Sequence, residues 1–191
     1  MNLPTDLYRA PPYKLRDKVK KIGTVDVSAI NGLLQTKTRD EWLENSLRQQ
    51  KFRVHQDTES LVLKWCENTG TDTPVETTRH YVDFEPLIKP ALDQIQDTYR
   101  YERPVIRKAM FAKLKAGGLI PEHADGAIAL RMVHRIHVPI VTNDQVHFFI
   151  DDTDFHMQAG EIIEIDNTRF HSVRNDSAVD RIHLIVDYYH A

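Results

Sequence analysis

Two residues with metal-binding side chains, His123 and Asp125, stand two positions apart in the segment IPEHADG. On an extended strand such side chains point to the same face, so they can occupy adjacent coordination positions on one metal ion. A third donor, His171, follows in the segment NTRFHSVRN and must arrive from a different strand. Two imidazoles and one carboxylate form the facial ligand set of non-haem Fe(II) oxygenases, which leaves open positions for a cosubstrate and O₂. The spacing predicts such a centre.

Basic side chains accompany these donors. By strand parity, Arg135 and His137 share one face of their strand, and Arg181 and His183 share one face of the run DRIHLIVDYY. An inward arginine requires an anion, because burying an unpaired guanidinium is costly. That anion is either a protein carboxylate such as Asp187 or a bound dicarboxylic acid. We favour the bound acid for Arg181, because a guanidinium fork matches a carboxylate.

A resemblance to a known family rests on four segments that occur in order, namely PEHAD, RIHVPIVTN, MQAGEIIEIDNTRFHSV and DRIHLIVDY. Together they resemble the aspartyl/asparaginyl β-hydroxylase family. This group of 2-oxoglutarate-dependent oxygenases includes bacterial hydroxylases of free proline. The resemblance extends over about residues 106–188.

The resemblance implies that His123, Asp125 and His171 bind Fe(II). One branch of the family has glycine at the carboxylate position and uses two histidine ligands. This chain keeps Asp125, which favours the amino-acid-hydroxylase side of the group.

The resemblance also assigns cosubstrate contacts. It implies that Arg181 binds the far carboxylate of 2-oxoglutarate, and that Arg135 and His137 contact the same molecule. The implied reaction uses O₂ to hydroxylate an unactivated C–H bond and releases succinate and CO₂. The substrate is then a small molecule or a peptide: a free amino acid, an amino-acid derivative or a residue within a peptide.

Composition limits the other classes. The chain has 191 residues, of which 28% are charged and 41% hydrophobic. Its net charge of −3 provides no excess of basic residues that would indicate nucleic-acid binding. The single cysteine, Cys66, rules out an internal disulfide. No apolar stretch suggests a signal peptide or a membrane span, so we expect a cytoplasmic protein. The sequence does not set the oligomeric state.

Periodicity predicts helices in the N-terminal half. We expect an extended arm over residues 1–25, a loop at 67–74, helices at 28–34, 38–50 and 85–99, and strands at 60–66 and 81–84.

From Pro104 onward, short β-rich runs alternate with turns that contain Gly, Asn and Asp. This pattern predicts a mainly β fold, a double-stranded β-helix of the jelly-roll or cupin-like type, with the N-terminal helices packed on one sheet. We expect a single domain over residues 1–191, in which 1–103 supply helices and edge strands and 104–191 form the barrel that holds the metal site.

Two other functions stay open on the residues alone. One is a cupin-like metal enzyme that does not use 2-oxoglutarate, and the other is a metal-free jelly-roll binding module with structural histidines. Zn²⁺ accepts the same donors, although a zinc hydrolase has no use for two inward arginines. The acidic run of Asp151, Asp152 and Asp154 is typical of a solvated turn, with contact to a cationic substrate group as the alternative.

Overall fold

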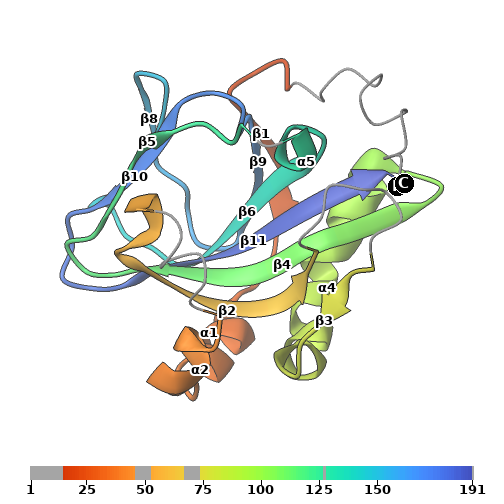
Figure 1. The fold of residues 1–191 in the computed structure, drawn as a ribbon, viewed down its shortest axis with the longest axis horizontal. Coiled ribbons are helices and arrows are strands. Elements are labelled where there is room, and N and C mark those ends of the chain that lie inside the picture. Colours follow the sequence, from red (N-terminus) through yellow and green to blue (C-terminus); the bar gives the residue numbers. More distant parts are fainter. Residues whose placement is uncertain (1–14, 46–52, 67–73, 127, 191) are drawn as a thin grey trace, which may run out of the picture.

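Two antiparallel sheets face each other in the computed structural model, which describes residues 15–45, 53–66, 74–126 and 128–190 (Figure 1). The larger sheet has seven strands in the order β1 (Val19–Thr24), β9 (Glu161–Ile165), β6 (His134–Val141), β11 (Arg181–His190), β4 (Pro104–Leu114), β2 (Thr58–Trp65) and β3 (Glu76–Thr77). The smaller sheet has four strands in the order β5 (Leu119–His123), β10 (His171–Asn175), β7 (Val146–Ile150) and β8 (Thr153–Phe155). This arrangement confirms the predicted double-sheet jelly roll.

Helices cover the outer face of the larger sheet. They are α1 (Ser28–Leu34), α2 (Arg39–Leu43) and α4 (His80–Tyr99), and Figure 1 shows them on the side away from the smaller sheet. A short helix α5 (Ile128–Arg131) and the 3₁₀ turn η2 (Arg53–His55) complete the described elements. None of the described helices has the length and apolar character needed to cross a bilayer.

The two faces of the larger sheet serve different purposes, because side chains alternate along a strand. In β6, Ile136, Val138 and Ile140 point outward into the hydrophobic core beneath the helices. Arg135 and His137 point the other way, into the space between the sheets. The predicted parity of this strand is therefore confirmed.

Helix α4 corrects one prediction. Residues 81–84 were expected to extend a strand, but α4 begins at His80 and includes them. Phe84 continues the buried stripe of Ile88, Ala91 and Ile95 at helical spacing, and its ring centroid lies 4.7 Å from that of Phe111 in the sheet. A helix extended by one turn buries Phe84, whereas an isolated short strand would have no partner here.

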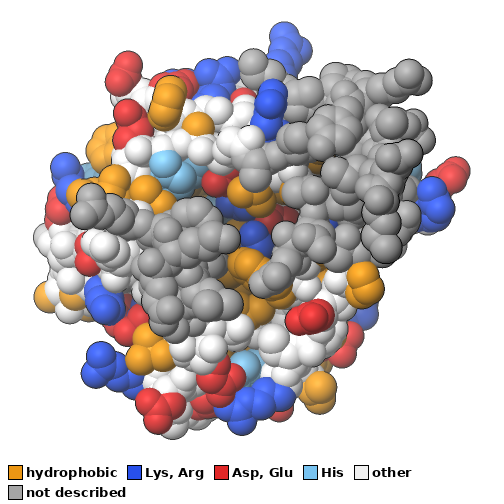
Figure 2. Space-filling view, in the orientation of Figure 1, with side chains coloured by type: hydrophobic (Ala, Val, Ile, Leu, Met, Phe, Trp, Pro, Cys, Tyr) orange, Lys and Arg blue, Asp and Glu red, His pale blue; other side chains and the backbone are white. Residues whose placement is uncertain are grey.

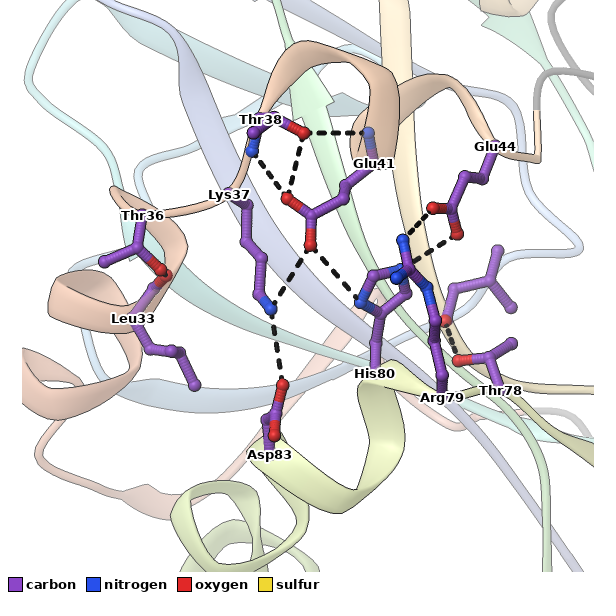
Figure 3. Close-up of polar contacts among 11 residues, drawn as sticks. Leu33, Thr36, Lys37, Thr38, Glu41, Glu44, Thr78, Arg79, His80 and Asp83 are labelled. Carbon is purple, nitrogen blue, oxygen red and sulfur yellow. Dashed lines mark hydrogen bonds and ion pairs between the residues drawn. The ribbon is translucent and has the colours of Figure 1, made fainter.

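Helix α2 is shorter than the predicted 38–50, because it ends at Leu43, and residues 46–52 lie outside the described part of the chain. Its predicted cap at Thr38 is confirmed: the backbone N–H of Glu41 donates to Thr38 Oγ1, and Thr38 N–H donates to the Glu41 carboxylate at 2.7 Å. Lys37 then bridges Glu41 at 3.5 Å and Asp83 at 3.3 Å, which ties α2 to the first turn of α4 (Figure 3).

The predicted extended arm is a strand from Val19 onward, and residues 1–14 lie outside the described part. Strand β1 pairs antiparallel with β9 at the edge of the larger sheet. Gly160 permits this close approach, because a Cβ at that position would lie 2.3 Å from the carbonyl oxygen of Val25. Its φ of +81° also favours glycine.

The packing of α4 gives the first prediction. Phe84→Ala removes a fully buried aromatic side chain and leaves a cavity, so it should lower the free energy of unfolding by about 3–5 kcal/mol. Val82→Ala, in the same turn but 72% exposed, is the control and should change it by no more than about 0.5 kcal/mol. Urea unfolding measures both, and an equal effect of the two substitutions would contradict the helical assignment of this segment.

Candidate functional site

A cavity between the two sheets collects the side chains that the sequence singled out. Figure 2 shows a hollow near the centre of this face, over β6 and β11, with charged and hydrophobic side chains in view. The polar residues that line the cavity include His123, Asp125, His171, Arg135, His137 and Arg181. Its apolar wall includes Ile120, Phe148, Val173 and Ile185.

The three predicted donors converge in this cavity. His123 ends β5 and His171 begins β10, and the two residues are paired across the antiparallel ladder. One donor atom from each of His123, Asp125 and His171 lies within 4.8 Å of the others. Asp125 is not on a strand as the parity argument assumed, since β5 ends at His123. A hydrogen bond from Asp125 N–H to the carbonyl of Asn167, at 3.0 Å, positions the loop instead.

Both histidines are held in the tautomer that a metal needs. Nδ1 of His123 lies 2.8 Å from the carbonyl oxygen of Pro121, and Nδ1 of His171 lies 2.9 Å from that of Arg169. A carbonyl only accepts, so Nδ1 carries the proton and Nε2 of each neutral ring is free to bind a metal. Burial lowers the pKa of His171 and so favours the neutral ring.

The carboxylate of Asp125 is oriented by two donors. Its Oδ2 accepts from Nη1 of Arg135 at 2.8 Å and from Nδ2 of Asn167 at 3.1 Å. Burial raises the pKa of Asp125, but the charge of Arg135, with smaller contributions from other neighbours, leaves that pKa below its ordinary value. Asp125 is therefore ionised, with Oδ1 left for a metal ion.

Arg135 also binds a second carboxylate, that of Asp187. Its Nε and Nη2 both donate to Asp187, the latter at 3.1 Å, and Lys108 lies 3.3 Å from the same carboxylate. Burial raises the pKa of Asp187, but the two cations outweigh it and lower that pKa to about 2. Asp187 is thus the partner of Arg135, and the guanidinium of Arg135 links it to Asp125.

Arg181 has a different environment. Its side chain is 2% exposed, and among the described residues no carboxylate forms an ion pair with it. Nη2 contacts Nδ1 of His183 at 2.6 Å, while the buried Nε has no hydrogen-bond partner in the described part of the chain. Burial lowers the pKa of Arg181 to about 9, which still leaves it cationic at neutral pH. An uncompensated buried cation with a free N–H is a receptor for an anion.

His137 faces the same cavity. Burial, followed by the nearby charges of Arg181 and Arg135, lowers the pKa of His137 well below its ordinary value, so the ring is neutral.

The acidic run lies elsewhere. Asp151 pairs with Arg169 at 3.0 Å and Asp154 with His147 at 2.7 Å, in the turn and strand after β7. Asp151 and Asp154 are outside the cavity lining, and each already has a side-chain partner in the protein. The arrangement is that of a surface turn.

Sequence reasoning missed one supporting residue, Asn167, and left the partner of another, Asp187, undecided. Asn167 is buried and donates both to Asp125 and, at 2.8 Å, to the carbonyl oxygen of Leu130. Asp187 holds Arg135; the sequence named Asp187 as a possible partner of an inward arginine but did not decide which arginine it binds. Neither partnership has a local signal, because each joins residues far apart in the chain.

The class follows from this architecture. A double-sheet antiparallel barrel whose cavity holds two histidines, a carboxylate and a buried arginine is the framework of the jelly-roll 2-oxoglutarate-dependent oxygenases. The sequence model of the family described as Aspartyl/Asparaginyl beta-hydroxylase matches residues 34–191. The chain belongs to this family and is a 2-oxoglutarate-dependent oxygenase.

Solved structures share the fold. A 2OG-Fe(II) oxygenase family oxidoreductase from Burkholderia pseudomallei is 15% identical, with a TM-score of 0.56 over 86% of this chain and 90% of that one. A viral collagen prolyl hydroxylase from Paramecium Bursaria Chlorella virus-1 is 10% identical, with a TM-score of 0.57 over 92% and 97%. A Pseudomonas putida prolyl-4-hydroxylase is 10% identical, with a TM-score of 0.51 over 92% and 94%. At these identities the likeness establishes the jelly-roll fold.

The buried ion pairs give the second prediction. Asp187→Asn removes the charge that balances Arg135 and should lower the free energy of unfolding by about 3–5 kcal/mol. Asp176→Asn, which breaks the exposed pair with Arg174, is the matched control and should cost no more than about 1 kcal/mol. Chemical denaturation measures the two effects. If Asp187→Asn were as mild as the control, Arg135 would not depend on Asp187 for its charge balance.

Proposed function

We propose that the protein is an Fe(II)- and 2-oxoglutarate-dependent hydroxylase that acts on an unactivated C–H bond of an amino acid, an amino-acid derivative or a residue within a peptide. The observation that carries this proposal is the combination, in one cavity, of a convergent His–Asp–His group with a buried arginine that lacks a carboxylate partner among the described residues. A metal site alone would not need that arginine.

The donor set fits Fe(II). Nε2 of His123, Nε2 of His171 and Oδ1 of Asp125 are the atoms that would hold it, since Nδ1 and Oδ2 are engaged in hydrogen bonds within the protein. When bound together, Fe(II) and 2-oxoglutarate supply the oxidative decarboxylation that consumes O₂, yields succinate and CO₂ and delivers one oxygen atom to the substrate.

The chain's own residues bind and orient the reactants. Arg181, whose Nε–H has no partner among the described residues, anchors the far carboxylate of 2-oxoglutarate, and the neutral ring of His137 contacts the same molecule. Arg135 lies at the edge of that site with its guanidinium holding Asp125. The apolar wall that includes Ile120 and Phe148 excludes water from the reacting centre.

The substrate class is supported by the relatives. The family is described by aspartyl and asparaginyl hydroxylation, and two structures of the same fold are prolyl hydroxylases.

The test of the proposed function incubates the Fe(II)-loaded protein with 2-oxoglutarate, O₂ and a panel of free amino acids and short peptides. Mass spectrometry should find one substrate that gains one oxygen atom, with an equal amount of succinate. Metal binding without consumption of 2-oxoglutarate would instead favour a cupin-like metal enzyme.

The third prediction concerns the metal. His171→Ala removes one of three ligand atoms, so it should abolish both retention of Fe(II) and turnover. The control is His147→Ala, which removes a histidine on the surface that pairs with Asp154 and should leave both properties unchanged. Metal analysis after gel filtration, together with a succinate assay, reads out the two variants. Full metal retention by His171→Ala would refute the proposed ligand set.

The fourth prediction concerns Arg181. Arg181→Ala removes the guanidinium partner of the cosubstrate carboxylate, and loss of a buried charge pair typically costs about 2–5 kcal/mol. At about 1.4 kcal/mol per factor of ten, 2-oxoglutarate should bind tens to thousands of times more weakly. Arg181→Lys should restore only part of the affinity, because an ammonium lacks the planar fork.

Anaerobic titration of the Fe(II) protein with 2-oxoglutarate measures this affinity. Retention of Fe(II) is the internal control and should survive in both variants, since Arg181 is outside the ligand group. Unchanged 2-oxoglutarate affinity in Arg181→Ala would show that the arginine does not bind the cosubstrate.

A further inference from the structure

Two buried arginines face the same cavity in opposite electrostatic states. Arg135 donates to the carboxylates of Asp125 and Asp187, so its charge is fully compensated. Arg181 instead donates to the imidazole of His183, at 2.6 Å. The group that holds each arginine therefore decides whether its charge is available to a ligand.

The contact with Arg181 fixes the protonation state of His183. A guanidinium only donates hydrogen bonds, so Nδ1 of His183 must be an unprotonated acceptor. The ring is then neutral, with its proton on Nε2, which is buried and has no partner among the described residues. His183 is 1% exposed, and burial together with the charge of Arg181 lowers the pKa of His183 well below its ordinary value.

A second ring, that of His137, is compatible with this tautomer of His183. Nδ1 of His137 lies 3.4 Å from Nδ1 of His183. Because Nδ1 of His183 accepts the shorter contact with Arg181, this longer contact is favourable when Nδ1 of His137 carries the proton of its ring. The His183 ring thus accepts a hydrogen bond from Arg181 without adding a negative charge beside the guanidinium.

We infer that His183 is a positioning residue for the cosubstrate: it holds the Arg181 guanidinium through a neutral acceptor and so keeps its positive charge for the far carboxylate of a dicarboxylic acid. This inference rests on the proposed function, because it concerns the same anion. A carboxylate at position 183 would hold the arginine as firmly but would compensate it, as Asp187 compensates Arg135. A side chain without an acceptor would leave the guanidinium unrestrained.

Three substitutions separate these effects. His183→Asn places an amide oxygen near the position of Nδ1 and should keep 2-oxoglutarate affinity within about tenfold of the wild type, the cost of one altered hydrogen bond. His183→Leu removes the acceptor and should bind more weakly than His183→Asn by about tenfold or more. His183→Asp compensates the charge and should weaken binding by about a hundredfold or more.

A purely structural role predicts a different pattern. In that case His183→Asp, which offers Arg181 an ion pair, would bind 2-oxoglutarate normally whenever it is folded. The matched control is His134→Asn, which alters a buried histidine in the neighbouring strand that bonds to Glu164 on the helix-covered side. That variant measures the effect of losing a buried imidazole and should leave cosubstrate affinity unchanged.

The experiment titrates each Fe(II)-loaded protein with 2-oxoglutarate in an anaerobic calorimeter and records its thermal unfolding separately. The affinity for 2-oxoglutarate should decrease in the order wild type, His183→Asn, His183→Leu, His183→Asp. All four proteins should retain Fe(II) equally. If His183→Asp fails to fold, the Asn and Leu variants still test the inference, because equal affinity in those two would overturn it.

The outcomes distinguish this inference from the proposed function. Absence of 2-oxoglutarate binding by the wild type would overturn both. Tight binding by the wild type, loss in Arg181→Ala and wild-type affinity in His183→Asp would overturn only the role of His183.

Discussion

The cost of burying charge organises the interior of this protein. Between the sheets, Lys108, Asp187, Arg135 and Asp125 form a continuous chain of alternating charge. A buried ion is tolerated only when partners repay its desolvation, so each member of this chain depends on the next. The end of the chain, Asp125, presents a carboxylate oxygen to the proposed metal position. The position of Asp125 thus depends on Asp187 in β11, through Arg135, although β11 contributes no ligand to the proposed metal centre.

The same constraint explains why the cavity can bind an anion. Arg181 lies on β11, as Asp187 does, but its polar contact among the described residues is with the neutral imidazole of His183. Strand β11 therefore holds both Asp187, whose charge is balanced by Arg135, and Arg181, whose charge is not balanced by a carboxylate among the described residues. The positive charge that remains at Arg181 faces a cavity with an apolar wall, where electrostatic attraction is stronger than in water.

Both histidine ligands of the proposed centre are prepared by the same local device. Each donates its Nδ1 proton to the carbonyl oxygen two residues earlier, Pro121 for His123 and Arg169 for His171. The antiparallel register of β5 and β10 then brings the two rings close together, with centroids 4.4 Å apart and planes tilted by 50°. Local backbone geometry sets the tautomer, and strand pairing sets the separation.

The sequence by itself determined the donor residues of the proposed metal centre, the inward parity of Arg135 and Arg181, the cap at Thr38 and the jelly-roll class. These features depend on periods of two or 3.6 residues and on short motifs, which are visible along the chain. Only the tertiary structure decided that Asp125 lies in a loop, that residues 81–84 are helical and that Asp187 pairs with Arg135. Those outcomes depend on contacts between distant segments, whose energies exceed local preferences and leave no periodic trace in the sequence.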